Sequence, residues 1–106
     1  DVSDTSGGHV VFASTLAGTN GRSLVICWGQ VTSTSSSTAI TYPVAYLHKP
    51  TVIACGADGG HSPAAETCTL DNITTTGCSV TSYQNNSGNS IGQINWISIG
   101  TANTAI

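Results

Sequence analysis

The sequence LVICWGQVTSTSSSTAITYPVAYLHKP, residues 24–50, runs from an almost wholly apolar segment through a Ser- and Thr-rich turn into a second apolar segment. Successive residues of a strand point to opposite faces. The apolar side chains fall on both faces, Leu24, Ile26 and Trp28 on one and Val25, Cys27 and Val31 on the other. A half-exposed antiparallel strand instead alternates apolar with polar residues. The pattern therefore predicts that something covers both faces of this strand.

The length and composition limit the classes of function that this chain can have. The 106 residues suffice for one domain with a modest core, and only 7% of them are charged. A net charge of −3 with two basic residues excludes the basic footprint that nucleic acids and anionic membranes require. No apolar run approaches the roughly 20 residues of a membrane span, so we expect no membrane insertion. Because the chain begins at Asp1, we expect a processed product or a fragment.

Abundant Ser, Thr, Gly and Asn, together with β-branched residues, predict an all-β fold. About seven short strands at a spacing of 8–12 residues are typical of an antiparallel β-sandwich. We expect residues 1–20 to be a connecting segment with one short strand, and residues 21–106 to be the sandwich. The expected strands are 22–32, 38–42, 44–47, 51–57, 65–73, 78–84 and 93–100, and Asn20-Gly21 is a hairpin turn signal.

The side chains that carry chemistry are sparse. No GxSxG, HExxH or acidic cluster occurs, and the three histidines lack metal-ligand spacing. We therefore predict no enzyme, no metal site and no cofactor. The four cysteines, Cys27, Cys55, Cys68 and Cys78, lie in apolar strand-like runs, which favours free buried thiols over disulfides.

Two polar loops carry the residue types that recognise sugars. The segment 57–66 contains Asp58, His61 and Glu66, and the segment 83–93 contains Tyr83, Asn85, Asn86 and Asn89. Amide, carboxylate and hydroxyl groups around an aromatic ring suit a glycan, and function in β-sandwiches lies on such loops. Tight turns need the same residue types, so both interpretations stay open.

Five segments in order resemble the C-terminal domain of bacteriophage tail fibres. They are Leu24-Val-Ile-Cys-Trp-Gly29, Ile40-Thr-Tyr-Pro43 with the following Val-Ala-Tyr46, Pro50-Thr-Val-Ile53, Ile73-Thr-Thr-Thr-Gly77 and Asn95-Trp-Ile-Ser-Ile-Gly100. The resemblance covers residues 22–100. Cys27 stands where Gln is usual in the family, and Tyr42 and Tyr46 stand where Phe is usual. These differences bear on ligand chemistry more than on the fold.

The resemblance implies a homotrimeric, non-enzymatic tip at the distal end of a virion's tail fibre. Such a tip binds bacterial surface glycan, commonly lipopolysaccharide, and fibres of this kind often use an assembly chaperone. A threefold assembly would also cover the second apolar face of the strands. The expected structural or interface residues are Leu24, Ile26, Trp28, Ile53, Trp96 and Ile97.

Two other functions remain open. A secreted lectin-like or adhesin sandwich shares the composition, and disulfides between the four cysteines would favour it, because a fibre assembles in the reducing cytosol. A purely structural trimerisation domain would leave recognition to another part of the fibre.

Overall fold

The computed structural model describes residues 7–13, 22–32, 37–56, 66–84, 88–89 and 93–103. They form strands and connecting segments, and none of them is helical. The strands are β1 (Gly7–Ala13), β2 (Arg22–Thr32), β3 (Thr38–Thr41), β4 (Thr51–Gly56), β5 (Glu66–Asp71), β6 (Gly77–Gln84), β7 (Gly88–Asn89) and β8 (Gln93–Asn103). In this described part of the chain, no helix is long and apolar enough to span a membrane.

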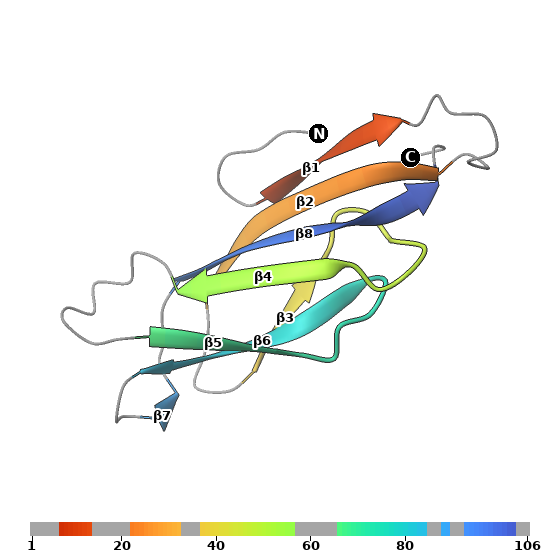
Figure 1. The fold of residues 1–106 in the computed structure, drawn as a ribbon. Coiled ribbons are helices and arrows are strands. Elements are labelled where there is room, and N and C mark those ends of the chain that lie inside the picture. Colours follow the sequence, from red (N-terminus) through yellow and green to blue (C-terminus); the bar gives the residue numbers. More distant parts are fainter. Residues whose placement is uncertain are drawn as a thin grey trace.

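The strands form two antiparallel sheets (Figure 1). Sheet A has the order β1-β2-β8-β4, and its two long strands, β2 and β8, pair over eleven positions from Arg22 opposite Asn103 to Thr32 opposite Gln93. Sheet B has the order β3-β6-β5, with β7 pairing with β6. The predicted all-β, antiparallel two-sheet fold is therefore confirmed.

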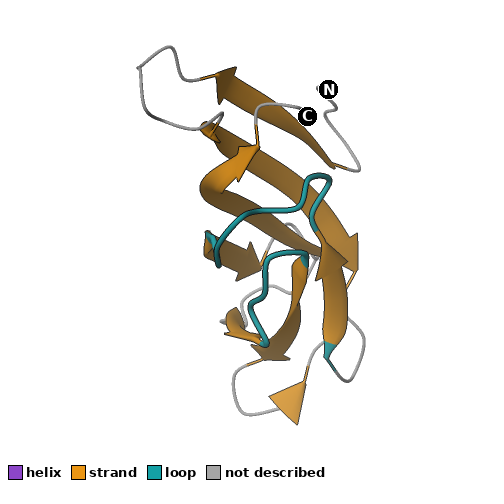
Figure 2. Ribbon diagram, turned by 90° about the vertical axis from the view of Figure 1, so that its right-hand side faces the viewer, coloured by secondary structure: helices purple, strands orange, loops and turns teal. Residues whose placement is uncertain are grey.

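The two sheets enclose the core with one face each, and the segment 42–50 adds side chains between them (Figure 2). Because alternate residues of a strand share a face, β2 and β8 bury every second side chain. The buried apolar residues are Val25, Cys27, Ile40, Tyr42, Val44, Tyr46, Cys78, Val80, Ile94, Trp96 and Ala102.

Segment 42–50 is an irregular strap rather than the short strand that we expected over 44–47. Its backbone is held by the turn that precedes β6, because Tyr42 N donates to Thr76 O and Tyr46 N donates to Thr75 O. Thr74 closes that turn, since its Oγ1 accepts from Gly77 N at 3.1 Å and donates to Gly77 O at 2.9 Å. The Thr-rich turn of the sequence thus positions the two tyrosines in the core.

β8 and β7 differ from the expected boundaries, whereas β1 is the one short strand expected within residues 1–20. β8 continues to Asn103, because the residues after Gly100 keep pairing with β2 down to Arg22. β7 lies inside the expected loop 85–92. β1 lies inside the segment 1–20 and pairs with β2 along its whole length, as part of sheet A. Residues 14–21 separate these two strands, and Asn20-Gly21 lies outside the described residues.

Candidate interface and receptor-contacting surface

The face of sheet A that points away from sheet B is apolar and exposed, and we call it the outer face. It comprises the even-numbered residues of β1 and β2 and the odd-numbered residues of β8 and β4. Its large apolar side chains are Val10, Phe12, Leu24, Ile26, Trp28, Ile53, Ile97 and Ile99. Ile53 is 60% exposed and Phe12 is 52% exposed, whereas Ile26 and Trp28 are half-buried by their neighbours.

These side chains form continuous rows across the sheet. Val10 lies opposite Ile26, which lies opposite Ile99. In the next row, Trp28 lies opposite Ile97, which in turn lies opposite Ile53. Directly opposed residues of antiparallel strands have their side chains in contact distance, so the rows make one patch. Contiguous exposed apolar patches of this kind mark interaction sites in soluble proteins.

Polar residues border the patch at both ends of the strands. Arg22 lies opposite Asn103 at one end, and Gln30 lies opposite Asn95 at the other. Gln93 Nε2 donates to Gln30 Oε1 at 2.7 Å and so ties β2 to β8 at that end. An apolar centre with a polar rim is the usual layout of a protein–protein interface.

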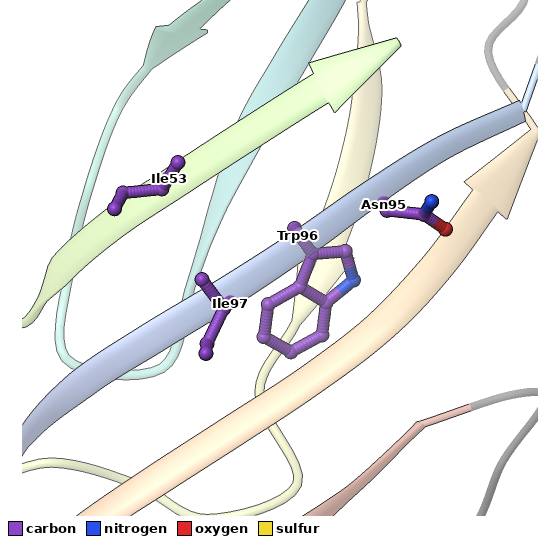
Figure 3. A pocket seen from close by; sticks show the side chains of 4 residues that line it. All are labelled: Ile53, Asn95, Trp96 and Ile97. Atoms are coloured by element: carbon purple, nitrogen blue, oxygen red, sulfur yellow. The ribbon is translucent and has the colours of Figure 1, made fainter. Parts of the chain in front are cut away.

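A hollow of about 220 Å³ lies over β4 and β8 (Figure 3). Its lining residues are Ile53, Asn95, Trp96 and Ile97. The lining is almost entirely apolar, and Asn95 at its end belongs to the polar rim. A hollow of this kind can accept an apolar side chain of a partner.

Trp96 has a different environment from the other expected interface residues. It points into the core, where its ring centroid lies 5.9 Å from that of Tyr42, and Tyr42 in turn lies 5.3 Å from Tyr46 in an edge-on arrangement. Leu24, Ile26, Trp28, Ile53 and Ile97 share the outer face. Trp96 is therefore a core residue of the sandwich.

Two glycines of the sequence pattern make room for these rings. A Cβ atom at Gly29 would lie 2.8 Å from ring atoms of Trp96, and one at Gly100 would lie 2.7 Å from Cδ1 of Tyr46. Distances this short do not occur between a Cβ atom and a ring. Three of the segments that resemble tail fibres therefore meet at one aromatic cluster, made of Tyr42, Tyr46 and Trp96. Gly29 and Gly100 are required beside it because any side chain there would overlap a ring.

The two tyrosine hydroxyls of the cluster differ in their partners. Tyr46 Oη lies 2.7 Å from Ser98 Oγ, and this buried hydrogen bond joins the strap to β8. Tyr42 Oη is buried and makes no hydrogen bond of regular geometry among the described residues, although the Cys78 thiol lies close enough to add to the effect of burial in raising the pKa of this phenol. Burial raises the pKa of both phenols above their usual range, because the phenolate would lose its hydration. Both tyrosines thus stay neutral at any physiological pH.

This difference predicts that the same substitution, Tyr to Phe, changes the free energy of unfolding by different amounts at the two positions. Tyr46→Phe leaves the buried Ser98 hydroxyl unpaired, so we expect it to lower the free energy of unfolding by about 1–3 kcal/mol. Tyr42→Phe removes a hydroxyl that makes no regular hydrogen bond within the described part of the chain, so we expect a change within about 0.5 kcal/mol or a gain in stability. Urea unfolding of the two variants checks this, and equal losses would contradict the assignment of the hydrogen bond.

Cys27 and Cys78 are buried free thiols in the structure, and Cys68 is half-buried. Burial raises the pKa of the Cys78 thiol above its usual range, which keeps it protonated and unreactive. The side chain of Cys55 is outside the described part of the structure. The expectation of free buried thiols therefore holds at Cys27 and Cys78.

The predicted glycan-contacting residues fall at one end of sheet B. Glu66 begins β5 opposite Gln84, the last residue of β6, and Tyr83 lies opposite Asn89 of β7. The backbone pairing thus brings Tyr83 beside Asn89, whereas Glu66 pairs one position further along β6. Asp58, His61, Asn85 and Asn86 lie outside the described residues. β4 and β6 end, and β5 and β8 begin, at this same end of the molecule (Figure 1).

No group of three or more metal-ligating side chains gathers within the described ranges.

The structure also adds residues that the sequence analysis did not single out. Phe12 and Ile99 belong to the outer face, and both could have been found from the alternation within HVVFA and ISIGTA once these stretches were taken as strands beside β2.

Comparison with known proteins agrees with this architecture. Residues 19–101 match the family model described as "Putative tail fiber protein gp53-like, C-terminal". The chain is similar in structure to a C-terminal portion of the Pseudomonas aeruginosa R2 pyocin fibre, with a TM-score of 0.60, 19% identity and coverage of 88% of this chain and 26% of the pyocin chain. It therefore spans about a quarter of that fibre fragment.

A second similar structure is an N-truncated R1-type pyocin tail fibre, with a TM-score of 0.58 and 20% identity. The alignment covers 86% of this chain and 85% of that one. No curated protein matches the sequence. At these identities the structural likeness establishes the fold, and the family follows from the match over most of the sequence. The chain belongs to the family of gp53-like tail fibre proteins and represents their C-terminal domain.

Proposed function

We propose that this domain is the receptor-binding tip of a phage or tail-like bacteriocin fibre, which attaches to bacterial surface glycan such as lipopolysaccharide. The observation that carries the proposal is the family match over residues 19–101, which concerns the C-terminal part of tail fibre proteins. In this proposal the domain binds without catalysis and is a component of the virion at the distal end of the fibre. An assembly chaperone is a further proposed partner.

The proposed functional unit is a homotrimer. The outer face of sheet A supports this, because a soluble monomer would expose Phe12, Leu24, Ile53, Ile97 and Ile99 to water in one patch. Three copies around a threefold axis would bury the patch in a shared core. A trimer also presents each glycan site three times, so that weak sites add up to firm attachment.

The proposed glycan contacts lie at the end of the sandwich where segments 57–65 and 85–92 begin. The pairing of Tyr83 with Asn89, and of Glu66 with the neighbouring Gln84, supports a common site there, because these backbone positions lie at one end of sheet B and their residue types supply phenol, amide and carboxylate groups. Such groups recognise sugar hydroxyls by hydrogen bonds and sugar rings by stacking.

The test is adsorption of the fluorescently labelled protein to a panel of bacterial strains and their purified lipopolysaccharides. In a strain that binds, the triple variant His61→Ala, Tyr83→Ala, Asn86→Ala is expected to lose roughly tenfold or more in affinity, because a few residues dominate binding. The control triple variant His48→Ala, Thr41→Ala, Thr69→Ala changes exposed residues elsewhere and is expected to bind normally. Degradation of the polysaccharide by the protein would contradict a non-enzymatic role.

A second candidate is a purely structural trimerisation domain. It is favoured by the observation that the segments shared with the family serve packing, since Gly29, Gly100, Tyr42, Tyr46 and Trp96 all belong to the aromatic cluster. Unchanged adsorption of the first triple variant, with the trimer intact, would favour this second candidate.

A further inference from the structure

Sheet A has two open edges, formed by β1 and β4. β1 pairs with β2 and β4 pairs with β8, and in the described part of the chain neither has a strand on its other side within the sheet. β5, which follows β4 in the chain, lies beside it but pairs only within sheet B (Figure 1), so the backbone groups of this edge remain without a strand partner among the described residues. Open edges are templates for pairing with another chain, and closed assemblies of strands remove them.

The directions of these two edges are complementary. Each of the three strand pairs across sheet A is antiparallel, so β1 and β4 run in opposite directions. A threefold rotation about an axis along the strands leaves every strand direction unchanged. It therefore brings β1 of one copy beside β4 of the next as antiparallel neighbours. A cyclic trimer needs such a contact between two different surfaces of the same subunit.

The outer face remains apolar up to both edges. Val10 and Phe12 lie on β1, and Ile53 lies on β4 beside the hollow over β4 and β8. Among the described outer-face positions of the four strands, Arg22 is the charged residue, and it lies at the end of the strands opposite Asn103. Three such sheets joined edge to edge would enclose a mainly apolar interior, with Thr51 and Thr101 as its polar members, and leave the polar rim at the two ends.

We propose that β1 of each subunit runs antiparallel beside β4 of the next, so that three copies of sheet A close into a prism around a common apolar core. The proposal rests on the trimer proposed above and adds which surfaces meet. It differs from a trimer in which the centres of the three sheets touch at the axis while the edges stay apart.

Disulfide trapping between edges tests this arrangement. Neighbouring strands lie about 5 Å apart, so cysteines on the same face of adjacent strands can form a disulfide. Every variant in this test also carries Cys55→Ser, which removes the native thiol of β4. Val10→Cys or Phe12→Cys is combined with Thr51→Cys or Ile53→Cys in four pairs, which sample three pairing registers on the outer face.

The expected result is that at least one of the four pairs yields covalent dimers and trimers of the chain after mild oxidation, and that dithiothreitol reverses them. Each variant that carries only one of the two introduced cysteines is expected to remain uncrosslinked, because β1 meets β4 of the next subunit and not another β1. The pair Val10→Cys with Ile97→Cys is the matched control, since Ile97 is on the same face but in a central strand. It is expected to remain uncrosslinked as well.

The solution mass before oxidation separates the two proposals. A trimer that crosslinks through an edge pair supports both. A trimer in which none of the four edge pairs crosslinks, or in which the Val10–Ile97 control crosslinks equally well, overturns the edge arrangement and leaves the trimer standing. A monomeric chain overturns the trimer and the edge arrangement together. Using four pairs keeps the test decisive if one variant fails to fold.

Discussion

The Trp96→Ala variant is expected to lose about 3–5 kcal/mol of its free energy of unfolding, a large share of the stability of a domain of this size. Trp96 is buried between the sheets, packs against Tyr42 and fills the space above Gly29. Removing the indole leaves a cavity that β2 and β8 cannot collapse into, because they are paired over eleven positions. Urea unfolding followed by circular dichroism measures the loss.

A double-mutant cycle with Gly29 gives the control. Gly29→Ala alone is expected to destabilise the domain by about 1–3 kcal/mol, because its methyl group would overlap the Trp96 ring. In the Trp96→Ala background the same change is expected to be close to neutral, since the ring is gone. Equal effects in both backgrounds would contradict the packing of Trp96 on Gly29.

Ile53→Asp is expected to convert the proposed trimer into monomers while the sandwich stays folded. Ile53 is 60% exposed in the single chain, so the carboxylate remains hydrated there. In the proposed trimer the same carboxylate would be buried without a partner in each of three subunits, at several kcal/mol per copy. Light scattering reports the mass, and circular dichroism reports the fold.

Thr69→Asp is the matched control, because Thr69 is exposed on β5 of sheet B, away from the outer face. It is expected to leave the mass unchanged. If Ile53→Asp also left the mass of a trimer unchanged, β4 would lie outside the interface.

The sheet architecture was predictable because the side chains of a strand alternate between its two faces with a period of two residues. In β2, successive apolar side chains point to opposite faces, so both faces of the strand are apolar. The sequence alone therefore indicated that each face must be covered. Sheet B covers Val25 and Cys27. Leu24, on the other face, remains 44% exposed in the single chain, which locates the uncovered side.

Other features depended on contacts that periodicity cannot show. Trp28 and Trp96 both lie in apolar stretches that the sequence predicts to be strands, and only the pairing of β2 with β8 places one on the outer face and the other in the core. Tyr46 resembles a strand residue in sequence, yet its backbone bonds to the turn at Thr75 and leaves the 44–47 segment irregular. The pairing of Tyr83 with Asn89 in a two-residue strand is equally invisible in a Gly/Asn-rich stretch.

The most direct test is the solution mass of the unmodified 106-residue chain by light scattering. Burial of the outer face between three copies predicts about 32 kDa, three times the 10.7 kDa of one chain. A mass that stays at 10.7 kDa across the accessible concentration range would leave the apolar rows of sheet A in water. That result would contradict the trimer and the fibre-tip arrangement built on it.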